Sequence, residues 1–201
     1  MEIAPYAEQI FYARELISQD LCQRIIALYC RDARKRRGFT VGSCGKKQKQ
    51  AAIKLTTDLE IREKGEWSGP CRALNQAVDA ALQTISGYLP ALQVWPLKWT
   101  GYKIQHYTRG EGYFKWHFDA VGPGTWDRQL AMVLYLNSVR EGGETCFHLQ
   151  DRKVKPIAGD AVFFPTFWTH THCAAIPRSE DKYIISSFIS FALPVAAQKL
   201  A

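Results

Sequence analysis

The 201-residue sequence predicts a single α+β domain, in which two N-terminal helices pack on one sheet formed by the second half of the chain. Two amphipathic stripes with helical spacing occupy the first half. After Pro96 the sequence pattern changes to short segments rich in β-branched and aromatic residues, separated by Gly, Pro and Asp. The composition, 47% hydrophobic and 22% charged, is typical of a globular domain of this length.

Ser18 is expected to cap the first helix, because its side chain can accept a bond from a free N–H group of the first turn. The apolar residues that follow share one helical face: Leu21, Ile25, Leu28 and Tyr29. A second helix should begin near Pro70 and end at Gly87. Its stripe consists of Leu74, Ala77, Val78, Ala81, Leu82 and Ile85.

Short strands are expected throughout the second half of the chain, at residues 98–107, 114–119, 129–136, 144–149, 161–164, 168–173 and 182–191. About seven strands with short turns are typical of a β-sandwich or a barrel.

The net charge of +7 is concentrated in residues 31–54, where nine basic residues face one acid, Asp32. That segment has a charge of +8, so the rest of the chain sums to −1. Such a segment suits contact with a polyanion, for example a nucleic acid or a ribosome-associated target. The alternative interpretation is a solvated loop.

Six cysteines are present without any C-x-x-C pair: Cys22, Cys30, Cys44, Cys71, Cys146 and Cys173. We therefore expect reduced thiols and a cytoplasmic protein rather than a disulfide or zinc framework. The apolar runs are too short to span a membrane, and the polar N-terminus is a poor signal peptide.

The tetrapeptide Trp116-His117-Phe118-Asp119 is the sharpest chemical feature. Residues two apart on a strand point to the same face, so the imidazole of His117 and the carboxylate of Asp119 can converge. A histidine from Thr169-His170-Thr171-His172 would complete two histidines and one carboxylate, the ligand set of non-haem Fe(II) oxygenases.

Six blocks in chain order extend this pattern. The first block is Tyr107, ten residues before His117, with GEGY at 110–113 between them. The next four are HFD at 117–119, LYLN at 134–137, GGETCF at 142–147 and PIAGDAVFF at 156–164. The last is His172, ten residues before Lys182. Over residues 97–191 the sequence resembles the Fe(II)- and 2-oxoglutarate-dependent oxygenases, in particular their prolyl 4-hydroxylase-like branch.

The resemblance implies a double-stranded β-helix (a jelly-roll relative) over residues 97–191, with residues 1–96 as a helical and basic support region of the same single domain. It also implies hydroxylation of an unactivated C–H bond, coupled to decarboxylation of 2-oxoglutarate to succinate and CO2. The cofactors implied are Fe(II), 2-oxoglutarate and O2, with ascorbate as the reductant common in the family.

His117, Asp119 and His172 are the metal ligands that the resemblance implies. His170 competes with His172 for the third position. In the family, ten residues separate the distal histidine from the basic residue that anchors the co-substrate. This spacing favours His172, because the residue ten positions after it is Lys182.

Lys182 would pair with the distal carboxylate of 2-oxoglutarate, with Arg178 as the fallback anchor. The alternative interpretation of Lys182 is an ordinary surface lysine. Tyr107 and Tyr135 match tyrosines that hydrogen-bond the co-substrate in related enzymes; otherwise they are core aromatics.

The substrate favoured by the resemblance is a prolyl residue in a peptide or protein. The alternatives are a free amino acid or small metabolite, a nucleic-acid or ribosome-associated target, and a non-catalytic or cupin-like metal-binding domain. An aspartate at 119 argues for hydroxylation rather than halogenation, and no arginine pair follows His172 as in demethylases. The aromatic stretch 163–168, with Trp116 and Trp126, could line a cleft or fill the core.

Overall fold

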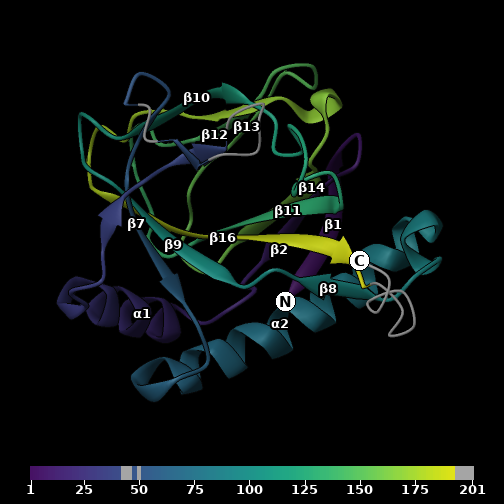
Figure 1. Ribbon diagram of the computed structural model, residues 1–201, viewed down its shortest axis with the longest axis horizontal. Helices are drawn as coiled ribbons and strands as arrows, with labels where there is room; N and C mark the ends of the chain where they lie inside the picture. The colour runs from purple at the N-terminus through teal and green to yellow at the C-terminus, as the bar shows by residue number, and fades with distance from the viewer. Residues whose placement is uncertain (42–46, 49–50, 193–201) are drawn as a thin grey trace.

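Two antiparallel sheets face each other across the centre of the molecule in the computed structural model (Figure 1). The structure describes residues 1–41, 47–48 and 51–192. The larger sheet has the strand order β1-β2-β14-β11-β16-β9-β7-β3, and β8 also pairs with β16. The smaller sheet has the order β13-β12-β15-β10-β6, and β4 pairs with β5 separately.

The strands of the larger sheet are β1 (Glu2–Ala7), β2 (Ile10–Arg14), β3 (Arg36–Arg37), β7 (Thr57–Ile61), β8 (Leu97–Trp99), β9 (Tyr102–Tyr107), β11 (Arg128–Tyr135), β14 (Ala161–Pro165) and β16 (Lys182–Phe191). Those of the smaller sheet are β6 (Lys54–Leu55), β10 (Tyr113–His117), β12 (Thr145–Phe147), β13 (Arg152–Val154) and β15 (His172–Ala174). The separate pair is β4 (Thr40–Val41) and β5 (Lys47–Gln48). Three 3₁₀ turns are η1 (Gly65–Trp67), η2 (Pro90–Gln93) and η3 (Trp168–His170).

Helix α1 (Gln19–Arg31) begins where the sequence predicts, because the Ser18 hydroxyl accepts a 3.2 Å bond from the Leu21 N–H. Helix α2 (Ser68–Tyr88) begins two residues before Pro70. It does not end at Gly87, as predicted, since the Leu89 N–H still bonds the Ile85 carbonyl. The helix stops before Pro90, which has no N–H group to continue it.

Both helices cover the outer face of the larger sheet (Figure 1). Ile25 of α1 and Leu74 of α2 are fully buried in one cluster with Ile104 of β9 and Ile185 of β16. Fully burying each such side chain contributes roughly 1.5–3 kcal/mol. This packing confirms the prediction of N-terminal helices on one sheet, and it leaves the inner face of that sheet free to line a pocket.

Two of the expected strands are interrupted. The strand predicted over residues 98–107 breaks at Gly101, whose φ of +95° does not fit a strand, and becomes β8 and β9. The strand predicted over residues 168–173 is instead the turn η3 followed by β15, which begins only at His172.

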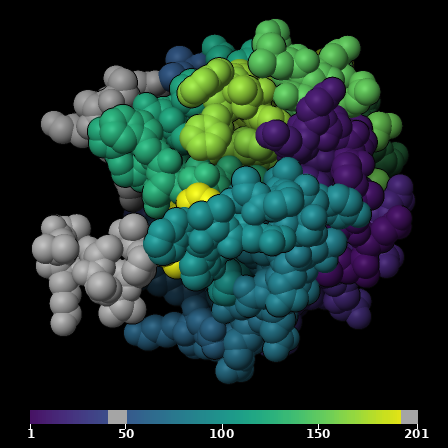
Figure 2. Space-filling view, turned by 90° about the vertical axis from the view of Figure 1, so that its right-hand side faces the viewer, coloured from purple at the N-terminus to yellow at the C-terminus, as the bar shows by residue number. Residues whose placement is uncertain are grey.

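The first half of the chain contributes strands that the sequence pattern did not reveal. β1 and β2 extend the larger sheet beside β14, and β7 pairs with β9. Strand β1 also contacts α2, and Figure 2 shows the N-terminal strands (purple) against the segment around α2 (blue to teal). Four of the nine strands of the larger sheet, β1, β2, β3 and β7, therefore come from residues before 97.

The basic segment, residues 31–54, is described only in part, because residues 42–46 and 49–50 lie outside the described residues. Arg36 and Arg37 form the short edge strand β3. Lys54, in contrast, is buried in β6. No described helix is both long and apolar enough to cross a membrane.

Candidate metal centre and adjoining pocket

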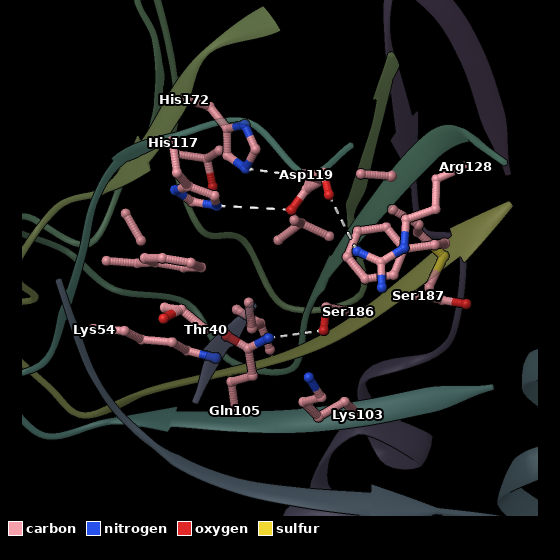
Figure 3. A pocket seen from close by; sticks show the side chains of 18 of the residues that line it. Thr40, Lys54, Lys103, Gln105, His117, Asp119, Arg128, His172, Ser186 and Ser187 are labelled. Atoms are coloured by element: carbon pink, nitrogen blue, oxygen red, sulfur yellow. Dashed lines mark hydrogen bonds and ion pairs between the residues drawn. The ribbon is translucent and has the colours of Figure 1, made fainter. Parts of the chain in front are cut away.

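Three predicted side chains converge between the two sheets. His117 is the last residue of β10, and His172 is the first residue of β15. The two histidines are opposite each other in the pairing of these strands, and Asp119 follows two residues after His117. One ligand atom from each lies within 4.8 Å of the others. Asp119 Oδ1 is 3.8 Å from His117 Nε2, and Asp119 Oδ2 is 3.7 Å from His172 Nε2 (Figure 3).

Backbone carbonyls set the tautomer of both histidines. His117 Nδ1 donates to the Lys115 carbonyl at 2.7 Å, and His172 Nδ1 donates to the His170 carbonyl at 3.0 Å. A carbonyl only accepts, so each Nδ1 holds the proton and each Nε2 keeps its lone pair. The free Nε2 atoms are the ones that face Asp119, which is the arrangement a metal ligand requires.

The electrostatics of the site also suit a metal. Burial, and then the neighbouring His172, keeps the pKa of His117 well below its usual value. The imidazole is therefore neutral at neutral pH, as a ligand must be. Two imidazoles and one carboxylate on one side of a common point leave the other side open, as in the 2-His-1-carboxylate sites of non-haem iron proteins.

Asp119 reaches this position by a different route from the one predicted. β10 ends at His117, so Asp119 is not on a strand. Its N–H and that of Ala120 both donate to the Thr166 carbonyl at 3.0 Å. These bonds hold the turn after β10 against the end of β14, and they direct the carboxylate toward the histidines.

His170 does not share a strand face with His172, as the sequence had suggested, because it lies in η3. Its Nε2 bonds the Glu8 carbonyl at 2.9 Å and its Nδ1 contacts the Thr169 hydroxyl at 3.0 Å. Both ring nitrogens therefore have protein partners. The geometry brings His172, and not His170, to Asp119.

Lys182 is buried, with 1% of its surface exposed, and lines the pocket that adjoins the metal centre. Its Nζ donates to the Gly143 carbonyl at 2.8 Å and lies 4.2 Å from the centre of the Tyr107 ring. Burial lowers the pKa of Lys182 to about 7. The fallback anchor Arg178 is exposed and lies 3.8 Å from Glu141.

The two predicted tyrosines are both buried beside the pocket. The Tyr107 hydroxyl donates to Gln105 Oε1 at 2.9 Å, and the Tyr135 hydroxyl donates to Thr145 Oγ1 at 2.8 Å. Burial raises the pKa of both hydroxyls, so they stay protonated and remain donors. Tyr107 and Thr145 line the pocket itself.

The pocket has a volume of about 570 Å³ and continues past the metal centre along the inner face of β9, β11 and β16. Sequence reasoning missed its polar residues Lys54, Lys103, Gln105 and Arg128. Lys54 forms a buried 2.9 Å ion pair with Asp58, each with 2% exposure. The i, i+2, i+4 spacing of Lys103, Gln105 and Tyr107 was the signal that could have placed these three on the pocket face.

The aromatic stretch divides between the core and the surface. Phe163 and Phe164 are buried, whereas Trp168 is exposed. Phe164 and Trp116 line the pocket; Trp126 is exposed and is absent from its lining.

Several solved structures share this fold. A viral collagen prolyl hydroxylase from Paramecium Bursaria Chlorella virus-1, in a 2-oxoglutarate complex, is 15% identical, with a TM-score of 0.68 over 92% of this chain and 97% of that chain. A Pseudomonas putida prolyl-4-hydroxylase is 20% identical, with a TM-score of 0.67 over 90% and 92%. A Trichoplax adhaerens prolyl hydroxylase, in complex with a hypoxia inducible factor peptide fragment, is 16% identical, with a TM-score of 0.70 over 91% and 84%.

These likenesses confirm the predicted double-stranded β-helix. No protein with a curated description matches the chain significantly in sequence. The fold and the two-histidine, one-carboxylate geometry define a non-haem iron dioxygenase that uses 2-oxoglutarate. Residues 102–190 match the family model of the 2OG-Fe(II) oxygenase superfamily, the family that the sequence motifs resemble. Fe(II), 2-oxoglutarate and O2 are the cofactors of this family.

Proposed function

We propose that the protein hydroxylates a prolyl residue in a peptide or protein, with 2-oxoglutarate converted to succinate and CO2. The observation that carries this proposal is the convergence of His117, Asp119 and His172 within 4.8 Å, beside a pocket that contains a buried lysine. The prolyl substrate is supported by the shared fold of the three prolyl hydroxylases, one of which holds a peptide.

In this proposal His117 and His172 hold Fe(II) through Nε2, and Asp119 holds it through its carboxylate. Bound Fe(II) supplies the activation of O2 that couples decarboxylation of 2-oxoglutarate to hydroxylation of a C–H bond. The carbonyl bonds to the two Nδ1 atoms keep the rings oriented for this ligation.

Lys182 receives the distal carboxylate of 2-oxoglutarate in this scheme. A buried ammonium whose described partners are a carbonyl and an aromatic ring lacks an anion, and a carboxylate would supply it. The Tyr107 and Tyr135 hydroxyls would orient the same co-substrate by exchanging their bonds to Gln105 and Thr145 for bonds to it. Phe164 and Ile184 line the pocket and exclude water from it.

The free thiols of the five described cysteines suit a reducing compartment, and the proposal therefore places the protein in the cytoplasm. Ascorbate is part of this proposal only as a reductant for the iron, and its concentration is to be varied in assays.

The test adds Fe(II) and 2-oxoglutarate to the metal-free protein under anaerobic conditions and follows visible absorption. The wild type should develop a weak metal-to-ligand charge-transfer band, and then release succinate when O2 and a proline peptide are added. His172→Ala and Lys182→Ala should both lose the band. Lys153→Ala, which removes an exposed lysine of β13, is the matched control and should keep it.

A folded wild type that develops no band and does not bind 2-oxoglutarate would overturn the proposal. Succinate release with proline peptides, accompanied by the mass of one added oxygen atom on the proline, would establish the prolyl activity. Succinate release without any peptide modification would instead direct the search to free amino acids.

A further inference from the structure

Besides Lys182 and the exposed Arg62, two cations of the pocket have no ion-pair partner among the described residues. Lys103 on β9 and Arg128 at the start of β11 both line the pocket and point into it (Figure 3). We call this pair the cationic wall. Neither residue belongs to the metal centre or to the Lys182 end of the pocket.

Strand register separates the cationic wall from the anchor for 2-oxoglutarate. Lys182 pairs with Tyr107, whereas Ser186 pairs with Lys103, four residues further along both strands. At about 3.3 Å per residue, the two lysine positions are roughly 13 Å apart along the sheet. A 2-oxoglutarate molecule held at Lys182 by one carboxylate and at the metal by the other has no carboxylate left for Lys103.

Two other charged residues along the pocket already have ion-pair partners. Lys54 pairs with Asp58 at 2.9 Å, and Glu60 pairs with Arg36 at 3.0 Å. No carboxylate of the described residues lies within ion-pair distance of Lys103 or Arg128, and residues 42–46, 49–50 and 193–201 contain no aspartate or glutamate.

The described contacts of the wall are aromatic rings and a backbone carbonyl. Lys103 Nζ lies 4.7 Å from the centre of the Phe39 ring. The Arg128 guanidinium lies 3.7 Å from the Phe188 ring centre, and its Nη1 donates a long 3.4 Å bond to the Asp119 carbonyl. Burial and the nearby Lys54 charge lower the pKa of Lys103 to about 8. An anion bound between these cations would offset that cost.

We propose that Lys103 and Arg128 bind a carboxylate of the substrate and thereby place the neighbouring carbon at the metal centre. This inference rests on the proposed function. Arg128 already touches the backbone of Asp119, so a carboxylate on its free edge lies next to the metal. The planar guanidinium has one face on Phe188, which leaves an edge that suits a planar carboxylate.

Such a carboxylate has two sources: an acidic side chain beside the target residue of a peptide, or the α-carboxylate of a free amino acid. Anaerobic binding to the Fe(II)- and 2-oxoglutarate-loaded protein separates them. The peptide arm compares blocked proline peptides with a flanking aspartate or with the nearly isosteric asparagine. The amino-acid arm compares proline with prolinamide.

We expect the acid member of one arm to bind at least tenfold more tightly than its amide partner. The difference should fall to about twofold in Lys103→Met and in Arg128→Met, while the control Lys153→Met keeps it. Equal affinities within both arms in the wild type, or no binding of any of the four compounds, would overturn this inference even if the variants fail to fold. The charge-transfer band of the loaded wild type reports on the proposed function separately, so its loss would point to that failure instead.

Discussion

At the scale of single residues, the partners of each ring nitrogen distinguish His172 from His170. His172 uses Nδ1 for a backbone carbonyl and presents Nε2 to Asp119, whereas both nitrogens of His170 have partners elsewhere. The two histidines are only two residues apart, so the two single alanine variants can be compared directly. We expect the two variants to differ in their affinity for Fe(II).

His172→Ala should weaken Fe(II) binding by more than about a hundredfold, because it removes a direct ligand, whereas altering a supporting residue usually costs 10–100-fold. His170→Ala should keep Fe(II) affinity and lower the free energy of unfolding by about 1–2 kcal/mol, through the lost bond to Glu8. Titration with Fe(II) and urea denaturation measure the two effects. The reverse pattern would move the third ligand to His170.

Lys182 supplies a second prediction at this scale, through the protonation of its amine. Its pKa of about 7 means that the free protein loses the ammonium charge as the pH rises above 7. A carboxylate binds the charged form, so 2-oxoglutarate affinity should fall by up to about tenfold per pH unit above 7. Calorimetric titration between pH 6 and 9 measures this trend. A pH-independent affinity in the wild type would exclude an ion pair with Lys182.

At the scale of elements, the short strand β6 is attached to β7 by the ion pair between Lys54 and Asp58. Thr56 also donates to Asp58 at 2.7 Å, so the carboxylate has two buried donors. β6 pairs with β10 of the smaller sheet, and β7 pairs with β9 of the larger one. The pair therefore joins the two sheets beside the pocket.

Removing one partner should leave an uncompensated buried group. Asp58→Asn should lower the free energy of unfolding by about 3–5 kcal/mol, because Lys54 remains buried without its anion. The double variant Lys54→Met/Asp58→Asn should lose less than the sum of the two single variants. Urea denaturation of the four proteins measures the coupling, and additive losses would show that the two side chains are independent.

At the scale of the whole molecule, the pocket collects buried lysines whose charge opposes folding. The pKa of Lys182 is about 7 and that of Lys103 about 8 in the folded chain, both below the ordinary lysine value of 10.5. The unfolded chain therefore binds more protons above pH 7, and folding becomes more favourable as the pH rises from 7 to 9. Placing two cations here destabilises the free protein and prepares the pocket for anions.

The free energy of unfolding of the metal-free protein should accordingly rise between pH 7 and 9, with a slope of at most about 1.4 kcal/mol per pH unit from Lys182. Lys182→Met should flatten the slope and be more stable than the wild type at pH 7. Saturating 2-oxoglutarate should stabilise the wild type more at pH 7 than at pH 9. A Lys182→Met variant that keeps the wild-type slope would contradict this account.

The order of motifs along the sequence was enough to predict much of the candidate site. The H-x-D spacing, the distal histidine and Lys182 ten residues later lie in segments where side-chain alternation and turn residues are local properties. The start of helix α1 and both ends of strand β16 were likewise predicted correctly, since a helix cap and an apolar period depend on neighbouring residues.

The tertiary structure alone decided several other features, because they depend on contacts between distant residues. β2 and β7 become strands by pairing with β14 and β9, and β1 does so by pairing with β2, although their own residues carry only a weak period. Asp119 reaches the histidines through two bonds to the Thr166 carbonyl, 47 and 46 residues away, rather than through strand alternation.

By itself, then, the sequence predicted the candidate ligand types, their order and the helices that support the sheet, since those follow from local spacing and periodicity. The choice between His170 and His172, the burial of Lys54 and Lys182, and the cationic wall of Lys103 and Arg128 were decided by tertiary structure. Register between strands far apart in the chain sets which side chains face one pocket, and the low polarity of that pocket sets which of their charges lack partners.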